Sequence, residues 1–191
     1  KAAVRYIVNE KPAKPTIDDA TIAKLKAAVL KPLALFEEHK GFTSQTDVNP
    51  NYIVPKMFMF RLQKLMDEYA GGVGSQFTTS KYLLERGLEL LGLLKEDSAH
   101  LGAANLHELM RCWENYHRMY QAEAHVRTIL FREETRWPGY YFRADFPKLN
   151  QEKWLCFVNC KMDPVTENWE MLKRPILPLF KSEGDHELLG G

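Results

Sequence analysis

Apolar residues recur every three or four positions through most of the first 132 residues, a spacing that predicts helices. Residues 1–9 predict the end of a helix, and the prolines in 10–16 predict a stiff, exposed connector. Thr16 or Asp18 can then cap a second helix, because its side-chain oxygen can accept a free N–H of the first turn. The apolar stripe of this second helix comprises Ile22, Leu25, Ala28 and Val29.

Proline and glycine mark the boundaries of the next elements. Pro32 falls inside the second helical pattern, so we expect a kink or a restart there, because proline lacks the N–H of a helical hydrogen bond. Gly41 should close this helix, and residues 42–54 should form a loop. Pro55 is a favourable first residue for a third helix, since the first turn needs no N–H at that position. The glycines expected to end that helix are Gly71, Gly72 and Gly74.

The second half of the chain changes from helical to extended patterns. Thr78, Thr79 or Ser80 should begin another helix, and the longest helical pattern covers about 103–132. Its expected core stripe comprises Leu106, Leu109, Met110, Trp113, Tyr116, Tyr120, Val126 and Ile129. Two later runs, Trp154–Met162 and Trp169–Ile176, predict strands joined by a hairpin loop. The predicted fold is therefore mainly α, a bundle of about four helices followed by a small antiparallel β-hairpin.

These patterns divide the chain into four parts. Residues 1–15 are expected to be the end of a preceding helix and a linker, and residues 16–135 the helical bundle. Residues 136–180 are expected to hold a loop and the hairpin, and residues 181–191 a disordered tail. The chain starts with a lysine directly inside a helical pattern, so we expect a fragment of a larger protein. The alternative is an initiator Met or tag that has been removed.

Composition excludes several classes of protein. The 191 residues are 45% hydrophobic, which is enough for a sizeable core. The 26 basic and 25 acidic residues are nearly balanced, which argues against a nucleic-acid-binding protein. No run of about 20 apolar residues is present, so we expect no membrane span. Three cysteines are an odd number and too few for a disulfide framework, which favours a reducing, cytoplasmic location.

The glycines and histidines offer weak candidates for chemistry. The run Gly71–Gly74 lies between two helices, whereas a phosphate-binding loop follows a strand. A helix-ending linker is the favoured interpretation, although an anion could bind at the start of the next helix. The histidine pairs nearest to one another on a helical face are seven and eight residues apart, and a helical zinc pair needs four. We therefore expect surface or capping roles for His100, His107, His117 and His125.

The cysteines also do not predict a metal or cluster site. Cys156 and Cys160 lie on one face of a predicted strand, where four residues span about 13 Å. They are too far apart to bind one metal ion. Cys112 lies in the longest helix, away from both. Iron–sulfur clusters need several closely spaced thiolates, so we assign no metal ligand to this chain.

The segment 134–147 has the highest density of arginine, carboxylate and aromatic side chains, and no regular periodicity explains it. Guanidinium groups can bind carboxylates or phosphates through paired donors, and aromatic rings supply rigid contact area. The structural or interface candidates are Glu134, Arg136, Trp137, Tyr140, Tyr141, Arg143, Asp145 and Trp154. Two interpretations remain open. The arginines and carboxylates pair with one another and fix the segment to the preceding helix, or the segment docks onto another domain or subunit.

The same residues resemble a known family. Glu134 and Arg136 followed by Arg143, Asp145, Phe146, Pro147 and, nine residues after the aspartate, Trp154 are similar to the carboxy-terminal region of the succinate dehydrogenase/fumarate reductase flavoproteins. The stretch between the two arginines, 137–142, is two residues longer than in most of that family, and Lys148, Leu149 and Asn150 replace an acidic run. With these departures, residues 131–145 and 154–161 resemble the adenylylsulfate reductase alpha-subunit branch of the family.

This resemblance carries implications about function. It implies a parent enzyme that binds FAD and interconverts adenylylsulfate and sulfite plus AMP, with electrons from a beta subunit that carries four-iron clusters. It implies that the flavin-binding and catalytic residues lie upstream, so no catalytic, cofactor-binding or metal residue is assigned here. The whole chain of 191 residues should be inactive on its own, with the flavin domain and the iron–sulfur subunit as its partners. Residues 1–8 resemble the last helix of the flavin domain, so residues 1–15 are expected to be the end of that helix and a linker. Alternatives are a free-standing helical interaction module, or the same domain from another fumarate reductase- or succinate dehydrogenase-type flavoprotein.

Overall fold

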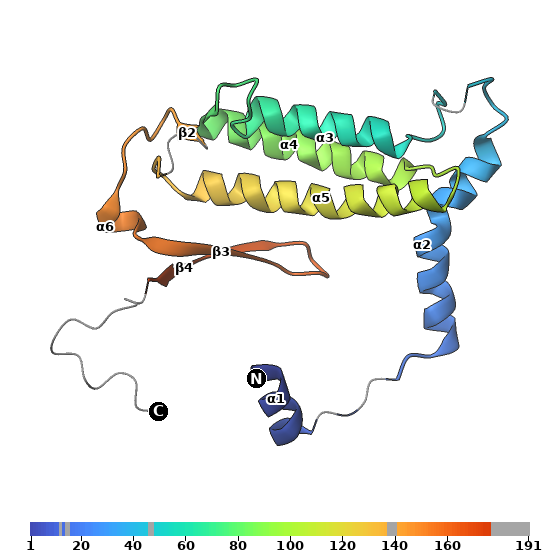
Figure 1. The fold of residues 1–191 in the computed structure, drawn as a ribbon, viewed down its shortest axis with the longest axis horizontal. Helices are drawn as coiled ribbons and strands as arrows, with labels where there is room; N and C mark the ends of the chain where they lie inside the picture. The colour runs from blue at the N-terminus through green and yellow to red at the C-terminus, as the bar shows by residue number, and fades with distance from the viewer. Residues whose placement is uncertain (12, 14–15, 46–47, 137–140, 177–191) are drawn as a thin grey trace.

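Three long helices, α3 (Pro55–Tyr69), α4 (Lys81–Asp97) and α5 (Leu106–Phe131), lie side by side and enclose the main core (Figure 1). The structure is a computed structural model, and it describes residues 1–11, 13, 16–45, 48–136 and 141–176. The centre of the core holds Phe58, Leu84 and Val126, whose side chains are fully buried between the three helices. The fold is mainly α with a small antiparallel hairpin, as the sequence pattern predicts.

Side-chain caps define the starts of two long helices, one at Ser80, which the sequence predicts, and one at Asn105, which it did not indicate. The Ser80 hydroxyl accepts the N–H of Leu83 at the start of α4, and the Asn105 side chain accepts the N–H of Glu108 at the start of α5. Pro55 is the first residue of α3, where no N–H is required. At the other end of α3, Gly71 adopts a φ of 81°, a left-handed conformation that favours glycine, and the chain turns away.

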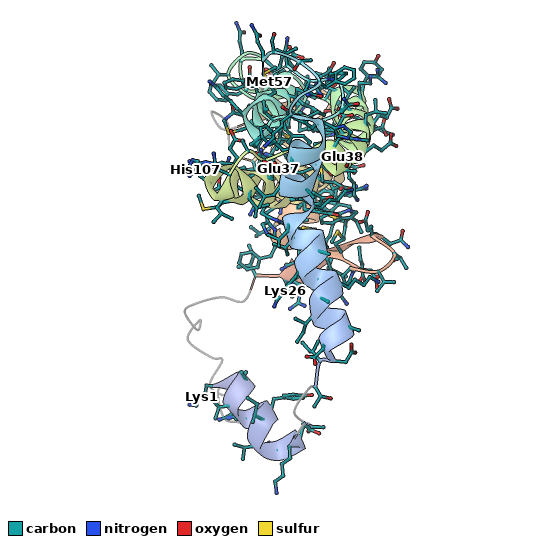
Figure 2. All side chains as sticks on the ribbon, turned by 90° about the vertical axis from the view of Figure 1, so that its right-hand side faces the viewer. Lys1, Lys26, Glu37, Glu38, Met57 and His107 are labelled. Atoms are coloured by element: carbon teal, nitrogen blue, oxygen red, sulfur yellow. The ribbon has the colours of Figure 1, made fainter. Side chains whose placement is uncertain are left out.

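The helix α2 (Asp19–His39) crosses one end of the bundle and extends beyond it, as both views show (Figures 1 and 2). Its start is capped by the carboxylate of Asp18, which accepts the N–H of Thr21 at 2.7 Å. The helix continues through Pro32 without a break, so the restart expected as one alternative is wrong. Toward its carboxy-terminal end the helix changes direction (Figure 1). Within the described residues, Phe36 is the single residue of α2 that is buried.

The buried face of α5 differs in part from the predicted one. Leu109, Val126 and Ile129 are buried as expected, but Leu106 and Met110 are 73% and 50% exposed, and their assignment to the core was wrong. The positions that complete the buried face are Cys112, Asn115, Met119 and Ala122, none of which the sequence pattern had assigned to the core. Together with the three correctly predicted positions, these residues follow one another at steps of three and four, as on one face of a helix. The predicted helical period is therefore right, but in the first turns of α5 a different side of the helix faces the core.

The hairpin lies beside α5 and is attached at its tip. Strand β3 (Cys156–Met162) pairs antiparallel with β4 (Trp169–Pro175), and β3 contacts α5. Glu167 in the loop accepts a hydrogen bond from the hydroxyl of Tyr120 on α5 at 3.1 Å and pairs with Lys95 on α4. The first strand starts later than predicted, because Trp154 belongs to a short helix, α6 (Gln151–Trp154), that the sequence pattern did not indicate.

Several smaller elements complete the chain. Strand β1 (Thr78–Thr79) pairs in parallel with β2 (Phe142–Arg143), and a short 3-10 helix, η1 (Ser98–His100), follows α4. Helix α1 (Ala2–Glu10) precedes α2 and has no residue that the described part of the chain buries. No described helix combines the length and apolar character needed to cross a bilayer. The tail predicted to be disordered, 181–191, lies outside the described residues.

Candidate functional site

The described residues of the segment 134–147 lie where α5 ends and α4 begins, at the same end of the bundle as α6 (Figure 1). Backbone hydrogen bonds join the segment to the start of α4. The N–H of Phe142 donates to the carbonyl of Phe77 at 2.6 Å, and the N–H of Ala144 donates to that of Thr79 at 2.9 Å. These bonds position the two arginine–carboxylate groups of the segment against the helix ends.

Arg143 is 1% exposed, and its guanidinium binds two kinds of acceptor. Nε and Nη2 donate to the two carboxylate oxygens of Asp145 at 2.8 and 2.7 Å. Nη1 donates to backbone carbonyls at the end of α5, namely those of Ile129, Leu130 and Arg132. The last carbonyls of a helix have no partner within the helix and form its negative end, so the buried cation both satisfies and stabilises the end of α5.

Asp145 contacts the other helix. Its Oδ2 accepts the N–H of Lys81, the first residue of α4, at 2.9 Å. The hydrogen bond from Arg143, supported by that of the Lys81 N–H, lowers the pKa of Asp145 although partial burial opposes it. The carboxylate thus lies at the positive end of α4 while its partner lies at the negative end of α5. One ion pair therefore connects the end of one helix to the start of the other.

Glu134 forms a second buried centre beside the first. Its carboxylate is fully buried and accepts hydrogen bonds from Arg132 at 2.7 Å, from Nε and Nη2 of Arg136 at 2.6 and 3.1 Å, and from the N–H of Asn150 at 2.8 Å. Burial by itself raises the pKa of this carboxyl. The hydrogen bonds from Arg136, Asn150 and Arg132 outweigh that effect and lower it. Glu134 is therefore held as a carboxylate.

Arg132 is a further member of this cluster, and the sequence did not single it out. Its Nη1 also donates to the carbonyl of Trp154 at 2.8 Å, and its Nη2 donates to the carbonyl of Cys156 at 2.8 Å. One guanidinium therefore connects the end of α5, the buried carboxylate and the start of β3. The sequence shows only an arginine two residues before a glutamate, and the other partners of Arg132, on α6 and β3, are 22 and 24 residues away.

Trp154 is 2% exposed and packs under the hairpin. Its ring contacts Phe131 edge to face, with centroids 5.5 Å apart. The ammonium of Lys173 on β4 lies 3.5 Å from the centroid of the indole ring. The indole N–H has no acceptor among the residues that the structure describes. These contacts give Trp154 a packing role between α5 and the hairpin.

The structure answers part of the question that the sequence left open. Glu134, Arg136, Arg143 and Asp145 form ion pairs inside the chain, which is the first of the two interpretations. Tyr141 packs half-buried against the core, whereas Trp137 and Tyr140 lie outside the described residues. The exposed apolar side chains of the neighbouring segment are Phe142, Leu149, Leu155 and Phe157, which are 37%, 49%, 56% and 59% exposed. We call these four residues the 142–157 surface.

The other candidates have structural explanations. The glycine run encloses Asp67, because the N–H of Gly74 donates to that carboxylate at 2.9 Å and a Cβ on Gly72 would lie 2.5 Å from the Cα of Asp67. A carboxylate in this position disfavours a bound phosphate. Burial raises the pKa of the Cys112 thiol to about 12, so this thiol is not reactive at neutral pH. Cys156 and Cys160 are half-buried on one face of β3, as expected.

No group of three or more His, Cys, Asp or Glu side chains in the described part of the chain could hold a metal ion. Most donors of the arginines that are buried here already bind carboxylates or backbone carbonyls of the same chain. The described residues therefore contain ion pairs with structural partners, and we assign none of them to catalysis.

Comparison with known proteins gives a specific likeness. No family model matches the chain. Adenylylsulfate reductase subunit alpha from Megalodesulfovibrio gigas is 45% identical over 183 residues, which cover 96% of this chain and 27% of that protein. The solved structure of adenylylsulfate reductase from the hyperthermophilic Archaeoglobus fulgidus is similar with a TM-score of 0.88 and 49% identity, covering 95% of this chain and 28% of that one. The chain thus spans about a quarter of the relatives it matches.

A more distant likeness concerns the fold alone. The Mycobacterium smegmatis Sdh1 complex contains a chain with a TM-score of 0.64 and 18% identity, over 94% of this chain and 28% of that one. The helical arrangement is therefore shared beyond the close relatives.

Proposed function

This chain is homologous over 96% of its length to one segment of adenylylsulfate reductase subunit alpha, and from that premise we propose that it is the carboxy-terminal helical domain of such a subunit. The parent enzyme interconverts adenylylsulfate and sulfite plus AMP in the cytoplasm, using FAD and electrons from an iron–sulfur beta subunit. The observation that carries the proposal is 45% identity over 183 residues, supported by the 0.88 TM-score to a solved reductase. A free-standing interaction module is not favoured, because nearly the whole chain aligns within a much longer enzyme subunit.

The proposed role of this domain is structural. FAD supplies the redox chemistry of the parent enzyme. A dinucleotide fold needs a strand, a glycine-rich turn and a helix in succession, whereas the glycine run here follows α3 and encloses Asp67. The described residues of this chain do not fit FAD, and no step of the reaction is assigned to them. They support the parts of the enzyme that do the chemistry.

We propose that the 142–157 surface contacts the iron–sulfur subunit. The buried ion pairs of Arg143 and Glu134 fix the backbone on both sides of it. Four exposed apolar side chains, two of them aromatic, then project from a rigid base. Exposed aromatic residues on a rigid base are typical anchors of subunit interfaces, because they bury much area and lose little conformational entropy.

Purification of the native gene product with its co-purifying partners tests the enzymatic proposal. We expect a polypeptide several times longer than this chain, flavin absorption bands, broad iron–sulfur absorption, and reduction of adenylylsulfate to sulfite and AMP. A colourless protein of about 22.2 kDa without this activity would contradict the proposal and favour a free-standing module.

Replacing Phe157 with aspartate in the full complex should weaken retention of the iron–sulfur subunit by at least about tenfold, because one aromatic anchor is worth roughly 2 kcal/mol when it is buried at an interface. The flavin content of the alpha subunit should stay unchanged. Leu93→Asp is the matched control, since Leu93 is 57% exposed and lies about three turns along α4 from the helix start that contacts the segment. Titration of the two subunits by gel filtration or light scattering measures the effect, and equal retention in both variants would disprove the assigned contact.

A further inference from the structure

The first half of α2 is an amphipathic helix that lacks a covering partner among the described residues. Every residue from 19 to 31 is exposed. The apolar stripe predicted from the sequence is present, but Ile22, Leu25 and Val29 are 37%, 56% and 44% exposed. A helical segment of this length is marginally stable in water unless an apolar face is buried. The sequence pattern of a core helix and the exposure of its stripe therefore disagree.

From the backbone of Val29 onward the same helix is held firmly. The carbonyl of Pro32 accepts the N–H of Ala103 at 2.9 Å, and the indole N–H of Trp113 donates to the carbonyl of Val29 at 3.1 Å. Phe36 is buried and its ring packs against Tyr52. The helix is thus anchored near the bundle, and its first half extends into solvent (Figures 1 and 2).

We infer that this stripe, Ile22, Leu25 and Val29, is the surface by which the domain packs against the rest of its own polypeptide, the flavin domain of the parent subunit. The inference rests on the proposed function. Its first support is length, because the chain aligns with 27% and 28% of the two reductase chains, which leaves about three quarters of a polypeptide outside it. That remainder is large enough to cover a projecting helix.

The second support is the neighbouring helix α1. It also presents apolar side chains without cover, with Val4, Tyr6, Ile7 and Val8 between 59% and 63% exposed. Eight residues separate the end of α1 from the start of α2, and they can span at most about 29 Å at full extension. Two uncovered apolar helices joined by so short a connector can pack against one continuous surface. We therefore assign the cover of both helices to the flavin domain.

The composition of the stripe favours a permanent contact within one polypeptide over a separable subunit. It contains aliphatic side chains only, as in a domain core, whereas the 142–157 surface contains aromatic residues. Interfaces that never separate resemble cores, and separable interfaces are enriched in aromatic and arginine anchors. A helical wheel places Ala27 about 160° from Leu25, on the side that would stay in solvent.

A photo-reactive benzoylphenylalanine placed at position 25 of the full-length alpha subunit, co-expressed with its beta subunit, tests the occupant directly. We expect a cross-link within the alpha polypeptide that joins peptides of α2 and of the flavin domain, identified by mass spectrometry. The same group at position 27 should give at most about a tenth of that yield. A cross-linked band with the mass of alpha plus beta, or of two alpha chains, would overturn the inference.

The contribution of the stripe is tested by Leu25→Glu against the matched variant Ala27→Glu in the same full-length subunit. Leu25→Glu should increase the rate of tryptic cleavage in the connector 11–18 by at least about tenfold, the factor expected when one leucine loses its burial. Ala27→Glu should cleave like the wild type. If both variants cleave at the wild-type rate, the stripe is not a docking surface.

The two proposals fail in different ways. If the wild-type subunit holds no flavin and lacks adenylylsulfate activity, the proposed function is wrong. If the wild type holds flavin and is active while position 25 cross-links no better than position 27, the function stands and the docking surface is wrong.

Discussion

Replacement of Arg143 with alanine is expected to lower the free energy of unfolding by about 3–5 kcal/mol, the usual effect of removing one partner of a buried ion pair. The change leaves Asp145 without its cation and the last carbonyls of α5 without a donor. Both losses act at helix ends, where the charges of the pair also interact favourably with the helix dipoles. Urea unfolding of wild type and variant, followed by circular dichroism, measures the difference.

The control for this substitution is Arg86→Ala. Arg86 pairs with Glu89 one turn along α4, and both side chains are more than half exposed. Solvent screens such a pair, so the midpoint of unfolding should be almost unchanged. The effect of a further variant, Asp145→Asn, on the free energy of unfolding should add to the effects of distant substitutions. It should not add to the effect of Arg143→Ala, because the two residues share one interaction. Equal effects of Arg143→Ala and Arg86→Ala would contradict the proposed coupling of helix ends.

Glu134→Ala should destabilise the chain by a similar amount, about 3–5 kcal/mol, since it leaves Arg132 and Arg136 partly buried without their common carboxylate. The preceding residue is a close control. Glu133 is 43% exposed and pairs with Lys153 across the surface, so Glu133→Ala should cost less than about 1 kcal/mol. Urea unfolding curves of the two single variants compare adjacent carboxylates in the same segment. Similar losses of unfolding free energy would show that the buried carboxylate of Glu134 contributes no more to stability than the exposed one of Glu133.

Acid should remove this stabilisation. The folded-state pKa values of Glu134 and Asp145 are lowered, so in acid the unfolded chain binds more protons than the folded one. The stability that these carboxylates contribute is complete above the ordinary pKa of 4.5 for Glu134 and is lost as the pH falls through the folded value. Glu134→Gln should therefore be less stable at neutral pH and lose less stability on acidification. The free energy of unfolding of both proteins is measured as a function of pH. If it falls as steeply in acid for Glu134→Gln as for the wild type, Glu134 is not a source of the acid sensitivity.

Local features of the fold followed from the sequence because they depend on neighbouring residues. Asp18 and Ser80 are caps that a helix start needs, and Pro55 suits a first turn. The hairpin followed from two alternating runs around a polar loop. The short helix that holds Trp154 was missed, because aromatic residues favour strands and the cap at Asn150 is formed over one turn only.

Long-range features were less accessible. The candidates Glu134, Arg136, Arg143 and Asp145 were found by composition, but the sequence did not distinguish pairing within the chain from docking. The contacts that decide this join Asp145 to Lys81, 64 residues away, and Arg132 to the start of β3. Similarly, the helical period predicted the stripe on α2 but not its exposure, because burial depends on what packs against the helix. The contact role of the 142–157 surface stays a prediction.

The ion pair of Arg143 and Asp145 has a consequence for how this end of the bundle opens. Helix ends normally fray one at a time, at little cost in free energy. Here the last turn of α5 and the first turn of α4 share one salt bridge, so neither can unwind without breaking a bond that the other also uses. The two helix ends should therefore exchange their amide hydrogens as one cooperative unit. The irregular segment that carries Arg143 and Asp145 should be protected from exchange to the same degree as the helix ends that it connects.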